Sequence, residues 1–143
     1  MKLLAIDTSS DACSVAINLH HEIIEKFELT PRKHIEALQP MVEAVLKESG
    51  LNLQDLDGLA FGCGPGSFSG LRIACSFIQG LSAALNLPVA AISTLGSMAF
   101  NALESNPDAV ILPCLDARMS EVYTALYYFN EQNNLYSLIN DCV

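Results

Sequence analysis

A glycine-rich segment is the part of this sequence whose residue types and spacing point most directly to chemistry. It lies between an expected strand and an expected helix and reads Gly62-Cys63-Gly64-Pro65-Gly66-Ser67-Phe68-Ser69-Gly70. Glycine lets a ligand or another backbone segment come close, and the amides of a helix N-terminus can bind an anion. The segment lacks both the lysine of a Walker phosphate loop and the G-x-G-x-x-G spacing of a dinucleotide site. The amides of Gly66, Ser67 and Phe68 can still face an anion, so phosphate binding and a structural or partner-facing turn both stay open.

Asp7 is the second candidate for chemistry, because it follows the first expected strand directly. An enzyme of the actin or hexokinase type holds a magnesium-linked aspartate at that place. Such an enzyme also needs glycine in the loop so that the phosphates can approach, and here the loop is Thr8-Ser9-Ser10. The alternative is that the Asp7 carboxylate accepts backbone hydrogen bonds within its own turn.

The remaining polar residues offer no complete catalytic set. His34 stands near the start of an expected helix, where a surface or capping role is the ordinary interpretation, and Ser67 lacks the G-x-S-x-G context of a nucleophile elbow. A charged corner is formed by Asp116, Arg118 and Glu121. It is either a weak surface salt bridge or a latch between lobes or at an interface.

Composition narrows the class of protein. The five cysteines are widely spaced without a C-x-x-C pair, which disfavours a zinc site or a disulfide framework. The net charge of −9, with seven Lys and Arg, opposes direct binding to nucleic acid. No apolar run approaches the roughly 20 residues that span a membrane, and no signal-peptide core precedes Asp7. We therefore expect a cytosolic protein that serves any nucleic-acid process through a partner.

The hydrophobic periodicity predicts an α/β protein that opens with three antiparallel strands and in which a β-β-β-α-β-α lobe begins a second time. The first helix is expected to start at Thr30-Pro31, to be kinked at Pro40 and to stop at Gly50. We place one lobe at residues 1–105 and the beginning of a second, incomplete lobe at 106–143. The other helices are expected at 68–85 and from Ser93 or Thr94 to 104, and the strands at 2–6, 12–19, 22–29, 56–62, 89–92, 109–115, 121–129 and 135–139.

Several motifs together resemble the TsaB (YeaZ) family along the whole chain. They are Leu4 to Ser10, His34 in its helix, Gly64 to Arg72 followed by Gln79-Gly80-Leu81, Ser93-Thr94-Leu95, and Asp116-Ala117-Arg118 followed by Glu121-Val122-Tyr123. The resemblance implies an actin-like, ribonuclease-H-like fold. Members of that family are longer than this chain, so we expect it to be a fragment or a truncated form.

The resemblance also implies a function. TsaB proteins take part in making threonylcarbamoyladenosine at adenosine 37 of tRNA, as non-catalytic scaffolds that bind the catalytic paralogue TsaD together with the ATPase TsaE. TsaD proteins carry a metal-binding His-x-x-x-His where this chain reads Ser93-Thr94-Leu95-Gly96-Ser97, and no histidine follows His34. We therefore expect neither catalysis nor a metal or cofactor, and contact with tRNA only through the complex. The alternative is a nucleotide-binding phosphotransferase that uses Asp7 and the glycine segment. A peptidase is disfavoured, because the sequence offers no credible nucleophile–base pair.

The partner surface is expected on the two longer helices, because their apolar faces would meet the equivalent helices of TsaD or of a second copy in a self-dimer. We expect Gly70→Leu or Ala74→Glu to weaken TsaD binding without unfolding the chain. The residues predicted for this surface are His34, Ile35, Leu38, Met41, Gly70, Leu71, Ala74, Phe77 and Ile78.

Overall fold

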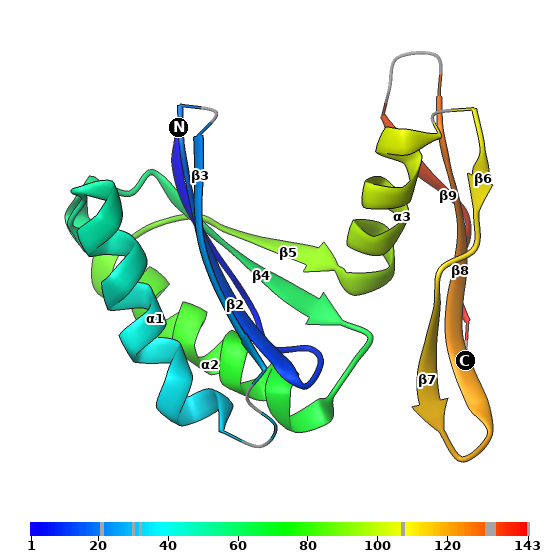
Figure 1. The fold of residues 1–143 in the computed structure, drawn as a ribbon, viewed down its shortest axis with the longest axis horizontal. Helices are drawn as coiled ribbons and strands as arrows, with labels where there is room; N and C mark the ends of the chain where they lie inside the picture. Colours follow the sequence, from blue (N-terminus) through cyan, green and yellow to red (C-terminus); the bar gives the residue numbers. More distant parts are fainter. Residues whose placement is uncertain (21, 30, 32, 107, 131–133, 143) are drawn as a thin grey trace. The chain divides into compact units, whose positions relative to one another are not determined.

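The computed structural model in Figure 1 describes residues 1–20, 22–29, 31, 33–106, 108–130 and 134–142. The chain divides into two compact units. The first contains residues 1–63 and 67–92, and the second contains 64–66 and 93–143. This division differs from the predicted one, which assigned residues 93–105 to the first lobe.

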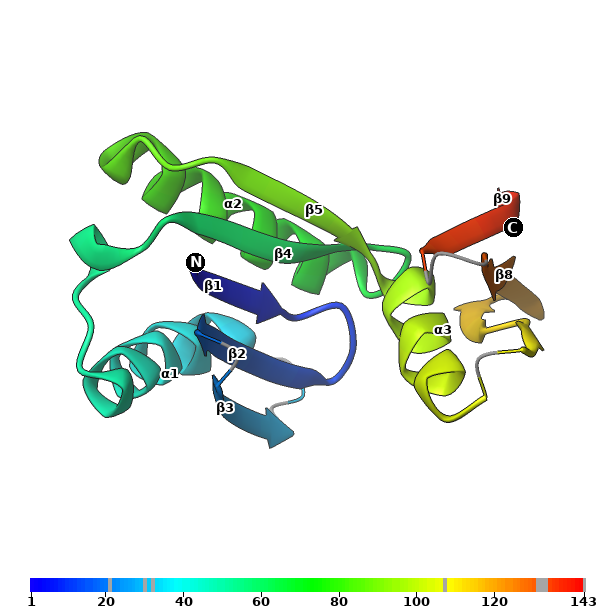
Figure 2. The same ribbon diagram turned by 90° about the horizontal axis from the view of Figure 1, so that it is seen from above.

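The first unit is built on a five-stranded sheet with the order β3-β2-β1-β4-β5, which Figure 2 shows from one edge to the other. The neighbours β1–β2 and β2–β3 are antiparallel, whereas β1–β4 is parallel, so the prediction of three antiparallel opening strands is confirmed. The strands are β1 (Lys2–Asp7), β2 (Ala12–Leu19), β3 (Glu22–Leu29), β4 (Gly58–Gly64) and β5 (Val89–Ser93).

Helices α1 (His34–Ser49) and α2 (Phe68–Leu85) lie on the same face of this sheet. The bounds of α2 are as predicted, and Gly50 ends α1 with the left-handed backbone that glycine favours, at φ 69°. The predicted start of α1 is wrong. Its N-cap is Lys33, without a side-chain cap, and Pro31 precedes the helix, while Thr30 lies outside the described residues. Burial of the inner face sets this helix start, because the cap signal adds only about 1 kcal/mol.

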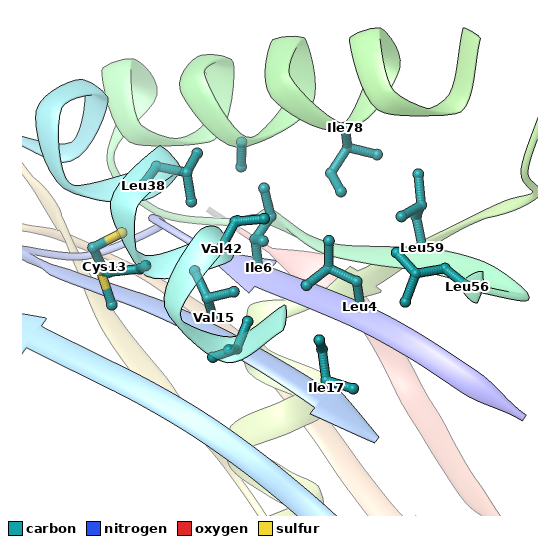
Figure 3. Packing of buried hydrophobic residues seen from close by; sticks show 13 residues of the cluster. Leu4, Ile6, Cys13, Val15, Ile17, Leu38, Val42, Leu56, Leu59 and Ile78 are labelled. Atoms are coloured by element: carbon teal, nitrogen blue, oxygen red, sulfur yellow. The ribbon is translucent and has the colours of Figure 1, made fainter. Parts of the chain in front are cut away.

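One apolar core joins the sheet to both helices (Figure 3). Cys13, Val15 and Ile17 of β2 are fully buried on a single face, as the alternating pattern predicts. Each fully buried Val, Leu or Ile side chain contributes about 1.5–3 kcal/mol. Helix α2 adds only Ala74 and Ile78 to this core, so most of its surface is left uncovered within the unit.

Helix α2 is also long and apolar enough to cross a membrane, judged by length and composition alone. The expectation that no segment reaches that length is therefore wrong for residues 68–85. Only 17% of this helix is buried: Ala74 and Ile78 pack into the core shared with α1, and Ile73, Phe77 and Leu81 pack against that core while partly exposed. A single such helix is weak evidence for a membrane protein.

A short 3-10 helix, Leu53–Asp55, is stabilised by a charged cap. The Asp55 carboxylate accepts hydrogen bonds from the Asn52 backbone N–H at 2.8 Å and from Asn52 Nδ2 at 3.2 Å. These bonds, the backbone one most, lower the pKa of Asp55 from its ordinary value of 3.8.

Asp55 should therefore stabilise the chain only while it is ionised. A lowered folded-state pKa adds stability that is complete above the unfolded-state pKa and is lost as the pH falls through the folded value. We expect Asp55→Asn to melt below the unaltered chain at neutral pH, and the difference to vanish well below pH 3.8. Thermal melts over a pH series measure this, and a difference that does not change with pH would contradict the lowered pKa.

The second unit packs one helix on an antiparallel sheet in which β8 pairs with β6, β7 and β9. Leu95 and Ala99 of the helix form a core with Ala125 and Tyr127 of β8, which explains why this helix belongs to the second unit. The predicted strand 109–115 is two strands, because Pro113 has no backbone N–H to donate to the sheet. The elements are α3 (Thr94–Ser105), β6 (Val110–Ile111), β7 (Cys114–Arg118), β8 (Glu121–Phe129) and β9 (Leu135–Cys142).

Candidate partner-binding surface

The turn after β1 is closed by Asp7. The Asp7 carboxylate Oδ1 accepts hydrogen bonds from the Ser9 backbone N–H at 2.8 Å and from Ser9 Oγ at 2.7 Å. These contacts are those of an Asx turn, which stabilises the backbone that follows a strand. They favour the structural interpretation of Asp7 over the magnesium-binding one.

The first turn of α2 packs directly on this β1–β2 turn, and that contact explains the glycine segment. Ser67 donates its backbone N–H to Ser9 O at 2.6 Å, and Thr8 Oγ1 donates to Gly70 O at 2.7 Å. A Cβ at Gly70 would lie 1.8 Å from Thr8 O, so only glycine fits there. Because Ser9 O already accepts the Ser67 N–H, this contact favours the structural interpretation of the turn over anion binding at Ser67. Gly66 is half-buried.

Gly62 has a similar role in β4. A Cβ at Gly62 would lie 1.8 Å from Asp7 Oδ2, so the absence of a side chain makes room for the Asp7 carboxylate. The glycine segment thus serves close packing of backbone and carboxylate within the first unit at both Gly62 and Gly70. Packing at these two positions needs no phosphate ligand.

The charged corner is the turn between β7 and β8. Asp116 Oδ1 accepts a hydrogen bond from the Arg118 backbone N–H at 2.7 Å, and Asp116, Arg118 and Glu121 are all exposed. Within the described residues the Arg118 guanidinium forms no ion pair with either carboxylate, which does not favour the salt-bridge alternative. Met119 and Ser120 both have positive φ, at 53° and 64°, as a two-residue type I′ turn requires. A latch at this corner stays a prediction.

The histidines do not assemble into a metal site in the part of the chain that the structure describes. His34 is the first residue of α1 and is 5% exposed, so its predicted surface position is wrong. Helix α1 begins one turn later than expected, and this places the His34 side chain on the inner face of the helix. His20 is exposed at the β2–β3 connection, and His21 lies outside the described residues.

Most residues predicted for the partner surface face the core instead. Ile35 is 74% exposed, and Leu71 and Phe77 are half-buried. Periodicity identifies an apolar helix face but does not say whether the sheet or a partner covers it. In the first unit the sheet covers it, and six of the predicted positions are buried, so their direct contact with a partner stays a prediction. They are His34, Leu38 and Met41 of α1 and Gly70, Ala74 and Ile78 of α2.

An apolar groove nevertheless runs between the outer faces of the two helices. We call it the helix-pair groove. Its volume is about 430 Å³, and Phe68, at 76% exposed, stands on the same face of α2 as Arg72. Exposed apolar surface of this kind commonly marks a binding site. The predicted partner surface did not include Phe68, Arg72 and Ser76, although their i, i+4 spacing places them on one face of a helix. The groove is lined by Ile35, Leu38, Arg72, Ile73, Ser76 and Phe77.

The strand order of the first unit and the pair of helices on one face define an α/β protein of the actin-like, ribonuclease-H-like class, as the resemblance implied. Two features stand out in the first unit, the tightly packed glycine segment and the helix-pair groove. The chain belongs to the TsaD family, tRNA N6-adenosine threonylcarbamoyltransferase, whose sequence model matches residues 20–143.

Individual relatives confirm the resemblance to TsaB proteins. The chain is 45% identical over 131 residues to the tRNA threonylcarbamoyladenosine biosynthesis protein TsaB of Escherichia coli strain K12, covering 92% of this chain and 57% of that protein. The TsaB protein of Haemophilus influenzae is 45% identical over 123 residues, covering 86% and 52%. The solved structure of YeaZ from Pseudomonas aeruginosa matches with a TM-score of 0.92 and 40% identity, over 99% of this chain and 66% of that one. The chain thus spans little more than half the length of these curated relatives.

Proposed function

We propose that this chain is a non-catalytic subunit in the synthesis of threonylcarbamoyladenosine at adenosine 37 of tRNA, and that it acts by binding TsaD, with TsaE, through the helix-pair groove. The similarity to proteins named for this biosynthesis supports the process. The observation that carries the mode of action is the groove itself, because it combines an apolar lining with the exposed Ile35 and Phe68.

A TsaD protein shares this fold class through the common family, so it can present an equivalent pair of helices. Packing helix pairs against each other buries the apolar outer residues of both, which is the usual driving force of such an interface. A second copy of this chain carries the same helices, so self-association would compete for the same groove. Contact with tRNA would come through the complex, because the net charge of −9 repels phosphate.

The central test is Ile35→Asp. The side chain is 74% exposed, so the change should leave the melting temperature nearly unaltered. Placing a charge in the centre of an apolar interface should cost about 2 kcal/mol or more of binding free energy, a roughly thirtyfold weaker Kd for TsaD. Isothermal calorimetry with purified TsaD measures it.

Ile23→Asp is the matched control. Ile23 is 64% exposed on the edge strand β3, and it does not line the groove. Its affinity for TsaD should be that of the unaltered chain. Equal affinities of the two variants would contradict docking in the groove. A tRNA-modification assay with and without the chain tests the process, and modification by the isolated chain would contradict a non-catalytic role.

A further inference from the structure

Arg72 occupies an unusual electrostatic position in the helix-pair groove. Its guanidinium carbon lies 5.3 Å from the centroid of the Phe68 ring, one turn earlier on α2. Among the residues that the structure describes, the ion pair present is Lys26–Glu48, so no carboxylate neutralises Arg72 there. The chain has 16 acidic and seven basic residues, so acidic side chains to pair with Arg72 are plentiful. The fold nevertheless leaves this cation beside the groove without one.

An unpaired guanidinium beside an apolar groove limits what can cover that groove. A purely apolar partner would strip water from Arg72 and leave the charge without a hydrogen-bond acceptor, which is costly. A partner that brings a carboxylate recovers that cost, because a guanidinium binds a carboxylate through two parallel hydrogen bonds. A polyphosphate chain is a poorer fit, because it needs several cations and the groove lining holds one, Arg72.

We infer that Arg72 is a specificity-determining residue of the proposed interface, and that it recognises an Asp or Glu on the helix that TsaD docks into the groove. The docked helix would place an apolar side chain against Ile35 and Phe77 and its carboxylate on Arg72. Stacking on Phe68 restrains the guanidinium before binding, which reduces the entropy lost on association. This inference rests on the proposed function and adds the chemistry of the partner.

The test is charge reversal by Arg72→Glu. Arg72 is exposed, so the melting temperature should change little. The Kd for TsaD should rise about thirtyfold or more, because two carboxylates would then face each other in a desolvated site. Arg72→Lys should be intermediate, about tenfold, because lysine keeps the charge but not the paired hydrogen bonds. Added salt should weaken the unaltered chain and strengthen Arg72→Glu.

Lys47→Glu is the matched control, because it reverses the charge of an exposed basic residue that does not line the groove and gives the same net charge. Its Kd should stay within twofold of the unaltered chain. An Asp or Glu to Lys scan of the docked TsaD helix should find one position that restores binding of Arg72→Glu.

The outcomes separate the two claims. If the unaltered chain binds TsaD and Arg72→Glu binds within threefold of it, the role of Arg72 is refuted and the proposed function stands. If Ile35→Asp and Arg72→Glu weaken self-association in sedimentation but not TsaD binding, the groove serves a second copy and the inference is overturned. If the unaltered chain does not bind TsaD, both claims are refuted.

Discussion

Replacing Gly70 with alanine is expected to destabilise the chain by about 3 kcal/mol or more. The added Cβ would lie 1.8 Å from the backbone oxygen of Thr8, and a backbone atom cannot move aside as a flexible side chain can. Relieving the overlap would separate α2 from the β1–β2 turn. It would also break the hydrogen bonds from Thr8 Oγ1 to Gly70 O and from Ser67 N to Ser9 O. Urea unfolding followed by circular dichroism measures the loss.

Gly80→Ala is the control for this prediction, because it makes the same chemical change further along α2. A Cβ at Gly80 meets nothing within 4 Å. Alanine is the better helix former, so this variant should be stabilised by about 0.5–1 kcal/mol. If the two variants changed stability in the same direction, the close approach of Thr8 would not explain Gly70.

Ala74→Glu is expected to have a comparably large effect, of about 3–5 kcal/mol, or to prevent folding. Ala74 is 0% exposed and belongs to the core cluster with Leu38 and Ile78. A glutamate there would be a buried charge without a partner, and neutralising it would leave a polar group in an apolar core. Thermal melting at neutral pH measures the effect.

Ala83→Glu serves as its control, since Ala83 is exposed on the same helix. The change should cost a few tenths of a kcal/mol, mainly because a carboxylate lies near the helix C-terminus. A similar melting temperature for the two glutamate variants would mean that Ala74 is not in the core.

These two expectations overturn the use of Gly70→Leu and Ala74→Glu as surface tests. The sequence pattern predicts small and apolar residues along one face of α2, and that is correct. The pattern cannot say what touches the face. Ala74 packs into the core and Gly70 meets the Thr8 carbonyl, so variants at either position would lose binding by losing the fold. Ile35 and Arg72 are the positions at which binding can be tested without that ambiguity.

Local signals explain which elements could be predicted. Strands β2, β3 and β8 and helix α2 have the expected bounds because turn residues, caps and alternation mark both of their ends. Helix α1 begins later than expected because the Thr30-Pro31 signal competes with burial of its inner face. The strand predicted over residues 109–115 splits because the missing N–H of Pro113 outweighs its apolar neighbours.

The amino-acid sequence by itself determined the order of the elements through α3, the three antiparallel opening strands and the resemblance to TsaB proteins, because each depends on patterns of residues near one another in the chain. Only the tertiary structure decided why the glycines are needed, since the Thr8 carbonyl and the Asp7 carboxylate reach them from the β1–β2 turn. It also decided which residues of α1 and α2 are exposed and can contact a partner. The sheet covers one face of α1 and α2, and the groove remains between their outer faces, with Arg72 in its lining. Contacts between residues distant in sequence are set by the packing of whole elements, and no local pattern encodes them.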